Sequence, residues 1–221
     1  MKNRAKNIFL IGLLTFFSYL MLKITLQYLP IDTDVAFLRI KQQYIHITHW
    51  RIAFFVHVFT SVWTLIAGFT QFFPFILRKY KALHRFMGKI YVFDVLFVAG
   101  PAGLVMSLYA NGGIMGRLAF ILLSILWLFT TYMAWERVRK KDFIAHKQWM
   151  VRSYALTLSA VTLRAWKWLF FVGAETLFSV ELPPRTVYIW VAWLGWVLNL
   201  AFAEYLISRR FPQIRDADSR R

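Results

Sequence analysis

The chain has 221 residues, of which 59% are hydrophobic, and its formal net charge is +17. A soluble domain is usually about 45–50% apolar, so the excess predicts a protein that lies in the lipid bilayer. The Lys and Arg residues cluster between long apolar stretches, which argues against nucleic-acid binding, and the absence of cysteine excludes disulfides and thiolate metal sites.

Six apolar segments are long enough to cross a bilayer, which takes about 20 residues of helix. In chain order they are Ile8–Leu26, Ile52–Leu77, Ile90–Tyr109, Leu118–Trp135, Trp149–Val172 and Val187–Ile207. The sequence therefore predicts an all-α polytopic membrane helix bundle of about six transmembrane helices. We expect residues 1–221 to form a single membrane domain, with a four-helix core at spans two to five.

Several local features refine this bundle. The first segment is interpreted as a retained anchor, because no small-residue cleavage pattern follows it. The loop at residues 30–49 has room for a short interfacial helix, and residues 208–221 read as a solvated tail. Gly100-Pro101 predicts a kink in the third segment, because proline cannot donate its backbone hydrogen bond.

The basic residues predict the orientation of the spans. Nineteen Lys and Arg residues fall at the two ends of the chain, between segments two and three, and between segments four and five, against six on the opposite side. Positive charge is retained on the cytoplasmic side of membrane proteins. Both termini are therefore predicted to be cytoplasmic.

Three histidines fall in or beside the predicted spans. His57 lies in the second segment, and His84 and His146 stand at the cytoplasmic starts of the third and fifth. Ionisable groups at membrane depth are costly and are functional candidates by default. Gly88, one turn after His84, offers either close approach of a flat group such as haem or ordinary helix packing through a small residue.

Further polar residues follow the same spans. The helical face of His146 continues through Met150, Ser153, Thr157 and Arg164, and we expect it to face the bundle interior. Three acids, Asp94, Glu136 and Glu204, are expected near the cytoplasmic side, where they suit haem or metal ligation, proton relay or structural ion pairing.

A combination of these residues resembles a known family. The pattern consists of His57 with Gly68, Leu83-His84-Arg85 with Gly88 and Tyr91, and His146 with Trp149-Met150, Arg152-Ser153 and Arg164. It is similar to the bacterial predicted membrane proteins of domain of unknown function 2306, over about residues 50–172. The resemblance implies a multi-pass protein of the bacterial inner membrane with these three histidines as its signature, and it implies no activity.

A looser likeness links the chain to transmembrane b-type cytochromes and ferric-reductase-like proteins. That likeness implies haem b held inside a four-helix core by histidines of neighbouring spans. Two haems would need four such histidines, so a single haem between His84 and His146 is the version that the sequence fits. Arg85 or Arg152 would then hold the haem propionates.

Four functional hypotheses follow. The leading one is a haem protein that transfers electrons, with His57 and Arg164 forming an outer site for a quinone or another redox partner. The second is a transporter or small-molecule binding protein that uses the same two residues. The third is an enzyme whose metal is held by His84, His146, Glu136 and Asp94. The fourth is an accessory subunit in which the polar residues are structural.

Overall fold

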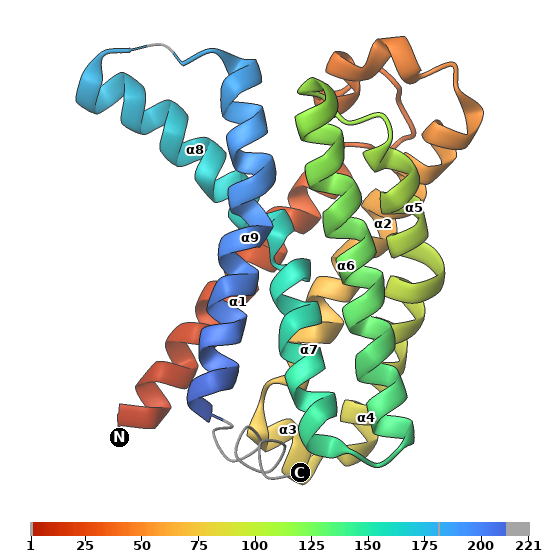
Figure 1. Cartoon of the computed structure of the whole chain (residues 1–221), viewed down its shortest axis with the longest axis vertical. Coiled ribbons are helices and arrows are strands. Elements are labelled where there is room, and N and C mark those ends of the chain that lie inside the picture. Colours follow the sequence, from red (N-terminus) through yellow and green to blue (C-terminus); the bar gives the residue numbers. More distant parts are fainter. Residues whose placement is uncertain (1, 181, 211–221) are drawn as a thin grey trace, which may run out of the picture. The chain divides into compact units, whose positions relative to one another are not determined.

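The computed structural model describes residues 2–180 and 182–210, and the regular elements within these ranges are all helices (Figure 1). The chain forms two compact units, Met1–Tyr109 and Ala110–Arg221, which we name unit 1 and unit 2.

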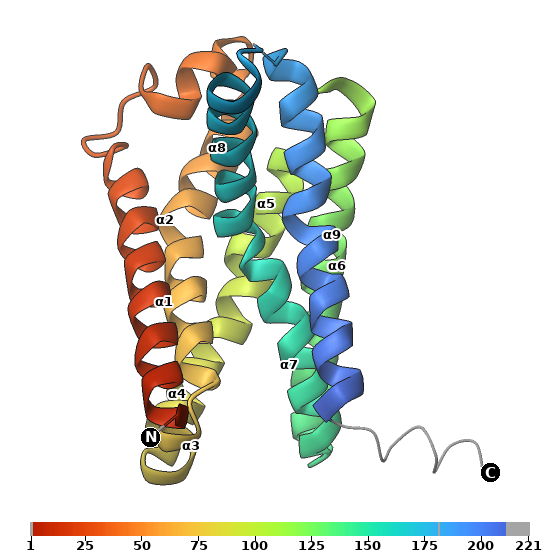
Figure 2. The ribbon, with the colours of Figure 1, turned by 90° about the vertical axis from the view of Figure 1, so that its left-hand side faces the viewer.

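Unit 1 is built around one long helix and one interrupted helix. The long helix α2 (Thr48–Gln71) packs against α4 (Lys81–Phe93), the π-helical turn η2 (Asp94–Val98) and α5 (Ala99–Ser107), which follow one another as a single helical stretch. The first helix, α1 (Lys2–Leu26), lies alongside α2 (Figure 2). A short helix, α3 (Pro74–Lys79), joins α2 to α4 and begins at Pro74, whose missing N–H is tolerated in a first turn.

The loop between α1 and α2 covers one end of unit 1 with aromatic residues. It contains the 3₁₀-helix η1 (Ala36–Tyr44), which agrees with the short helix expected in this loop. Leu38 of η1 is buried together with Tyr28, Trp50 and Phe54. This apolar packing fixes η1 against the first turns of α2.

The described residues of unit 2 form four helices, α6 (Gly113–Arg139), α7 (Phe143–Thr157), α8 (Ser159–Phe178) and α9 (Pro184–Arg210). The Asp142 carboxylate caps α7 by accepting the Ala145 N–H at 3.0 Å. Helix α6 packs along α7, and α9 packs against α6, α7 and α8.

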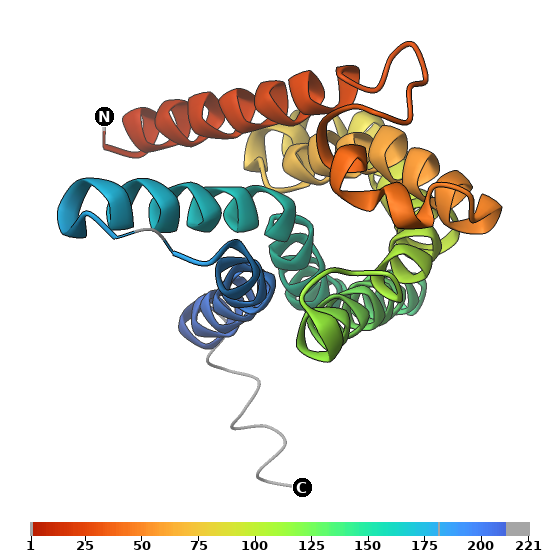
Figure 3. The same cartoon turned by 90° about the horizontal axis from the view of Figure 1, so that it is seen from above.

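The fifth predicted span is bent by 41° between α7 and α8 (Figure 3). The Asn199 amide of α9 donates to the Ala155 carbonyl at 3.1 Å, and in an unbroken helix that carbonyl accepts from the N–H of residue 159. Asn199 also donates to the Thr162 hydroxyl, which in turn donates to the Gly195 carbonyl at 2.6 Å. Polar groups of α9 therefore satisfy the backbone at the bend.

The membrane character of the chain is confirmed, and the structure supports fewer spans than the sequence predicts. Four stretches are long and apolar enough to cross a bilayer, Thr48–Gln71, Lys81–Ser107, Gly113–Arg139 and Pro184–Arg210, and the bent pair of α7 and α8 makes up to five. In α1 the apolar part with described side chains, Ile11–Leu26, is shorter than these. The protein is therefore an all-helical integral membrane protein with four to five candidate spans.

Several predicted segment edges differ from the observed helices, among them the end of the second span and the start of the third. The second span ends at Gln71 rather than Leu77, because a new helix begins at Pro74. The third helical stretch begins at Lys81 rather than Ile90. Asp94, expected one turn from the cytoplasmic end, therefore lies near the middle of its stretch.

Candidate functional site

Unit 1 holds a polar cluster in the middle of its two long helical stretches. His57 on α2 donates from Nδ1 to the Ala99 carbonyl at 2.8 Å. The Asp94 carboxyl is hydrogen-bonded to the Thr60 hydroxyl and to the Ala99 N–H. One turn of α2, carrying His57 and Thr60, therefore contacts the Ala99 carbonyl and the carboxyl at the start of η2.

The Asp94 side chain is enclosed by protein. Asp94 is only 7% exposed, and its Oδ2 has no hydrogen-bond partner among the residues that the structure describes. The π-helical turn follows from Pro101, which cannot donate to the carbonyl one α-helical turn before it, and the Ala99 N–H bonds the Asp94 carbonyl across the wider turn. Such π-turns occur frequently at functional sites.

The region of His84 is built for helix packing. A Cβ added at Gly88 would lie 3.1 Å from the Gln71 side-chain oxygen of α2, so the glycine admits a neighbouring helix. His84 is half-buried, and Arg85 is exposed with its Nε donating to the Lys81 carbonyl at 3.4 Å. Of the two interpretations of Gly88, this contact favours packing.

In unit 2 the ring of His146 is held in a defined orientation. Its Nδ1 lies 2.8 Å from the Ala134 carbonyl of α6. A carbonyl oxygen can only accept, so Nδ1 carries the hydrogen, and in the neutral ring Nε2 carries the lone pair. Histidines that ligate metals show this arrangement, in which a backbone carbonyl fixes the tautomer and the ring direction.

Two of the predicted binding residues near His146 already have charged partners. Arg152 of α7 forms a two-pronged pair with Glu204 of α9, at 2.5 Å and 2.8 Å, and its guanidinium lies 4.6 Å from the Trp149 ring centre. Glu136 accepts from Lys140 and lies 3.6 Å from Arg137.

The third hypothesis required a metal-binding group of side chains. Within residues 2–180 and 182–210, no group of three or more His, Asp and Glu side chains is placed to hold a metal ion.

The polar stripe predicted from His146 is interior only as far as the bend. Met150, Ser153 and Thr157 are buried. Thr157 accepts from the Trp127 indole of α6, and Ser153 Oγ lies 2.6 Å from Thr131 Oγ1 of the same helix. Arg164 lies beyond Leu158, is exposed, and donates to the Ala160 carbonyl at 2.6 Å. Within unit 2, Arg164 therefore does not continue the buried face, because the helix changes direction before it.

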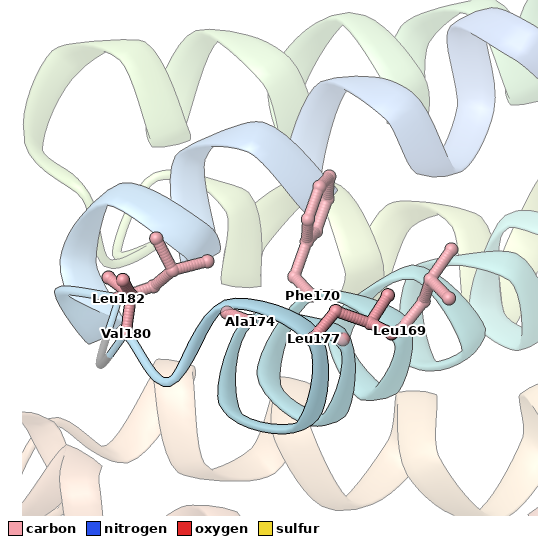
Figure 4. A pocket seen from close by; sticks show the side chains of 7 residues that line it. Leu169, Phe170, Ala174, Leu177, Val180 and Leu182 are labelled. Carbon is pink, nitrogen blue, oxygen red and sulfur yellow. The ribbon is translucent and has the colours of Figure 1, made fainter.

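An apolar pocket of about 470 Å³ lies in unit 2 beside the end of α8 (Figure 4). Phe170 and Leu177 of α8 and Val180 and Leu182 of the following loop line it, together with Leu169, Gly173 and Ala174. The lining offers no side chain for hydrogen bonding or ligation, so the pocket lacks the polar groups of a specific site.

Some residues that were predicted to lie at different depths are close together in the structure, and other predicted pairs are not tested by it. His57 and Asp94 were expected at different depths and share one cluster. His84 and His146 belong to different units, as do His57 and Arg164, and both pairings stay predictions. Thr60 and Asn199 were missed, although the position of Asn199 in the middle of an apolar span was a signal that could have identified it.

A family model described as predicted membrane protein (DUF2306) matches residues 54–207. The chain belongs to this family. The match includes the three histidines and extends past residue 172 through most of α9, so the family-like region is longer than the sequence reading proposed. No curated protein and no solved structure matches the chain, and the likeness to b-type cytochromes finds no support in these comparisons.

Proposed function

We propose that this DUF2306 protein is a b-type haem protein that transfers electrons within the membrane, with His146 as an axial ligand of the iron. The observation that supports it is the hydrogen bond from His146 Nδ1 to the Ala134 carbonyl at 2.8 Å. It directs the lone pair of Nε2 away from α6, as an axial ligand requires.

The His146 ring lies on the helix face of α7 that carries buried residues. The ring is half-buried at the start of α7, within a helix that carries a buried face of Met150 and Ser153. Arg152 donates from two nitrogens to the Glu204 carboxylate, so we do not include Arg152 among the residues that would hold the haem propionates.

The test is an absorption spectrum of the full chain, expressed with haem supplied and purified in detergent. We expect a Soret band with about one haem per chain in the wild type and in His46→Ala, and loss of the band in His146→Ala. His46 is exposed beside η1, so it is a matched control. A colourless wild type, or a His146→Ala variant that folds and keeps the whole band, would contradict the proposal.

We also propose that the chain crosses the bacterial inner membrane six times, with both ends in the cytoplasm. Two observations support this: α1 is a helix of 25 residues, and the bent pair α7 and α8 is together long and apolar enough for one broken span. The distribution of Lys and Arg supplies the direction.

A further inference from the structure

The polar cluster of unit 1 contains a carboxyl group that ordinary structural roles do not account for. Asp94 is 7% exposed, and no charged side chain of the described chain is among the groups that act on it, which are the Thr60 hydroxyl and the Ala99 N–H. The helices packed against η2 are α2, α4 and α5. Their titratable side chains include His57, committed through Nδ1 to the Ala99 carbonyl, and the buried Tyr91.

The hydrogen bonds around Thr60 allow two arrangements. Thr60 Oγ1 lies 2.8 Å from the Val56 carbonyl and is also bonded to the Asp94 carboxyl. A hydroxyl has one hydrogen, and a carbonyl oxygen can only accept. If Thr60 donates to Val56, Asp94 must donate to Thr60 as a neutral acid; if Asp94 is ionised, the Thr60 hydrogen turns to the carboxylate.

The same inventory favours a proton over a metal cation as the ligand. A metal cation takes several oxygen ligands, about six for sodium-like or magnesium-like coordination. Here the Ala99 carbonyl already accepts from His57, and within the described residues no group of three or more His, Asp and Glu side chains is placed to hold a metal ion. Asp94 Oδ2, buried and without a partner among the described residues, offers one position, which suits one proton.

We propose that Asp94 is a proton-binding site in the middle of the membrane span, at which Thr60 accepts or donates the hydrogen bond according to whether the proton is bound. His57 is a positioning residue, because its bond to the Ala99 carbonyl holds the π-helical turn that presents the carboxyl. The site lies wholly in unit 1 and does not depend on haem.

The test is infrared difference spectroscopy of the full chain, reconstituted in lipid without haem and taken between acidic and alkaline pH. We expect the carbonyl band of a neutral carboxylic acid that disappears at alkaline pH. The band should be lost in Asp94→Asn and kept in Asp34→Asn, which removes an exposed aspartate of the same chemistry. A pH-dependent band that is unchanged in folded Asp94→Asn would overturn the proposal.

A second pair of variants covers the case in which Asp94→Asn does not fold. Thr60→Val removes the hydrogen-bond partner and should shift the frequency of the band, whereas Thr60→Ser should restore it. No shift in Thr60→Val would contradict the two-state role of Thr60. Repeating the spectra in sodium chloride and in choline chloride separates the ligands, because ionisation that depends on sodium would replace the proton site with a cation site.

Discussion

Lys41, which lies in the loop between α1 and α2, is buried and has a structural role that the sequence did not indicate. Its side chain is 2% exposed, its ammonium donates to the Tyr109 carbonyl after α5, and the Tyr44 ring centre lies 5.0 Å away. A cation near a helix C-terminus is stabilised by the carbonyl groups there, and an aromatic face adds to the attraction. Lys41 therefore joins η1 to the end of α5.

Replacing this lysine should destabilise unit 1. Lys41→Met keeps most of the apolar stem and removes the charge-assisted hydrogen bond, so we expect a loss of ~2 kcal/mol in the free energy of unfolding. For a chain of this size that corresponds to a melting temperature lower by roughly 4–8 °C. Thermal unfolding in detergent measures it, with the exposed Lys23→Met as control. Equal melting temperatures would show that the buried ammonium contributes nothing.

Some of the candidate residues could be predicted from the sequence, and others could not, for a physical reason. His57 and His146 were identified because few histidines occur in apolar segments, and both form defined hydrogen bonds to backbone carbonyls. Thr60 and Lys41 were missed because their roles depend on partners 34 and more residues away, such as Tyr109. Hydropathy shows where a polar group is costly, and it does not show which partner compensates that cost.

Helices α8 and α9 approach each other closely at a glycine. A Cβ added at Gly195 would lie 3.0 Å from Leu163 Cβ and 3.2 Å from Leu163 Cα, so the helix backbones meet at this position. Small residues commonly allow such contact between membrane helices. The Thr162 and Asn199 hydrogen bonds beside it join the same two helices.

Widening this contact should weaken unit 2. Gly195→Ala should cost about 1–3 kcal/mol, because Leu163 can move only together with its backbone. In Gly173→Ala, the matched control on α8, the new Cβ meets nothing within 4 Å, and alanine favours the helix by up to about 1 kcal/mol. Thermal unfolding of both variants measures the difference. A Gly195→Ala variant as stable as Gly173→Ala would refute close packing here.

Hydropathy predicted the existence of the long helices better than their interruptions. The predicted fourth segment lies wholly within α6, because a long apolar run needs no distant partner to form a helix in a membrane. The bend after Thr157 was not predicted, since the group that bonds the Ala155 carbonyl there is Asn199, 44 residues away. A kink was expected at Gly100-Pro101, and the structure has a π-helical turn, Asp94–Val98, just before these residues.

The proposed orientation of the chain in the membrane can be tested chemically. The chain contains no cysteine, so a single introduced cysteine can be labelled without background. Gln43 in η1 and Ser208 near the end of α9 are both exposed. A membrane-impermeant maleimide applied to intact spheroplasts should label Gln43→Cys at once and Ser208→Cys only after permeabilisation. The reverse pattern would contradict the predicted orientation.

His146 is proposed to ligate the haem iron. Electron paramagnetic resonance of the oxidised full chain, expressed with haem supplied, tests this proposal, because an imidazole ligand favours low-spin ferric haem and its removal should abolish the low-spin signal. We predict a low-spin signal in the wild type and in His46→Ala that is absent in His146→Ala. A wild type without ferric haem, or a low-spin signal that persists in folded His146→Ala, would contradict the assignment.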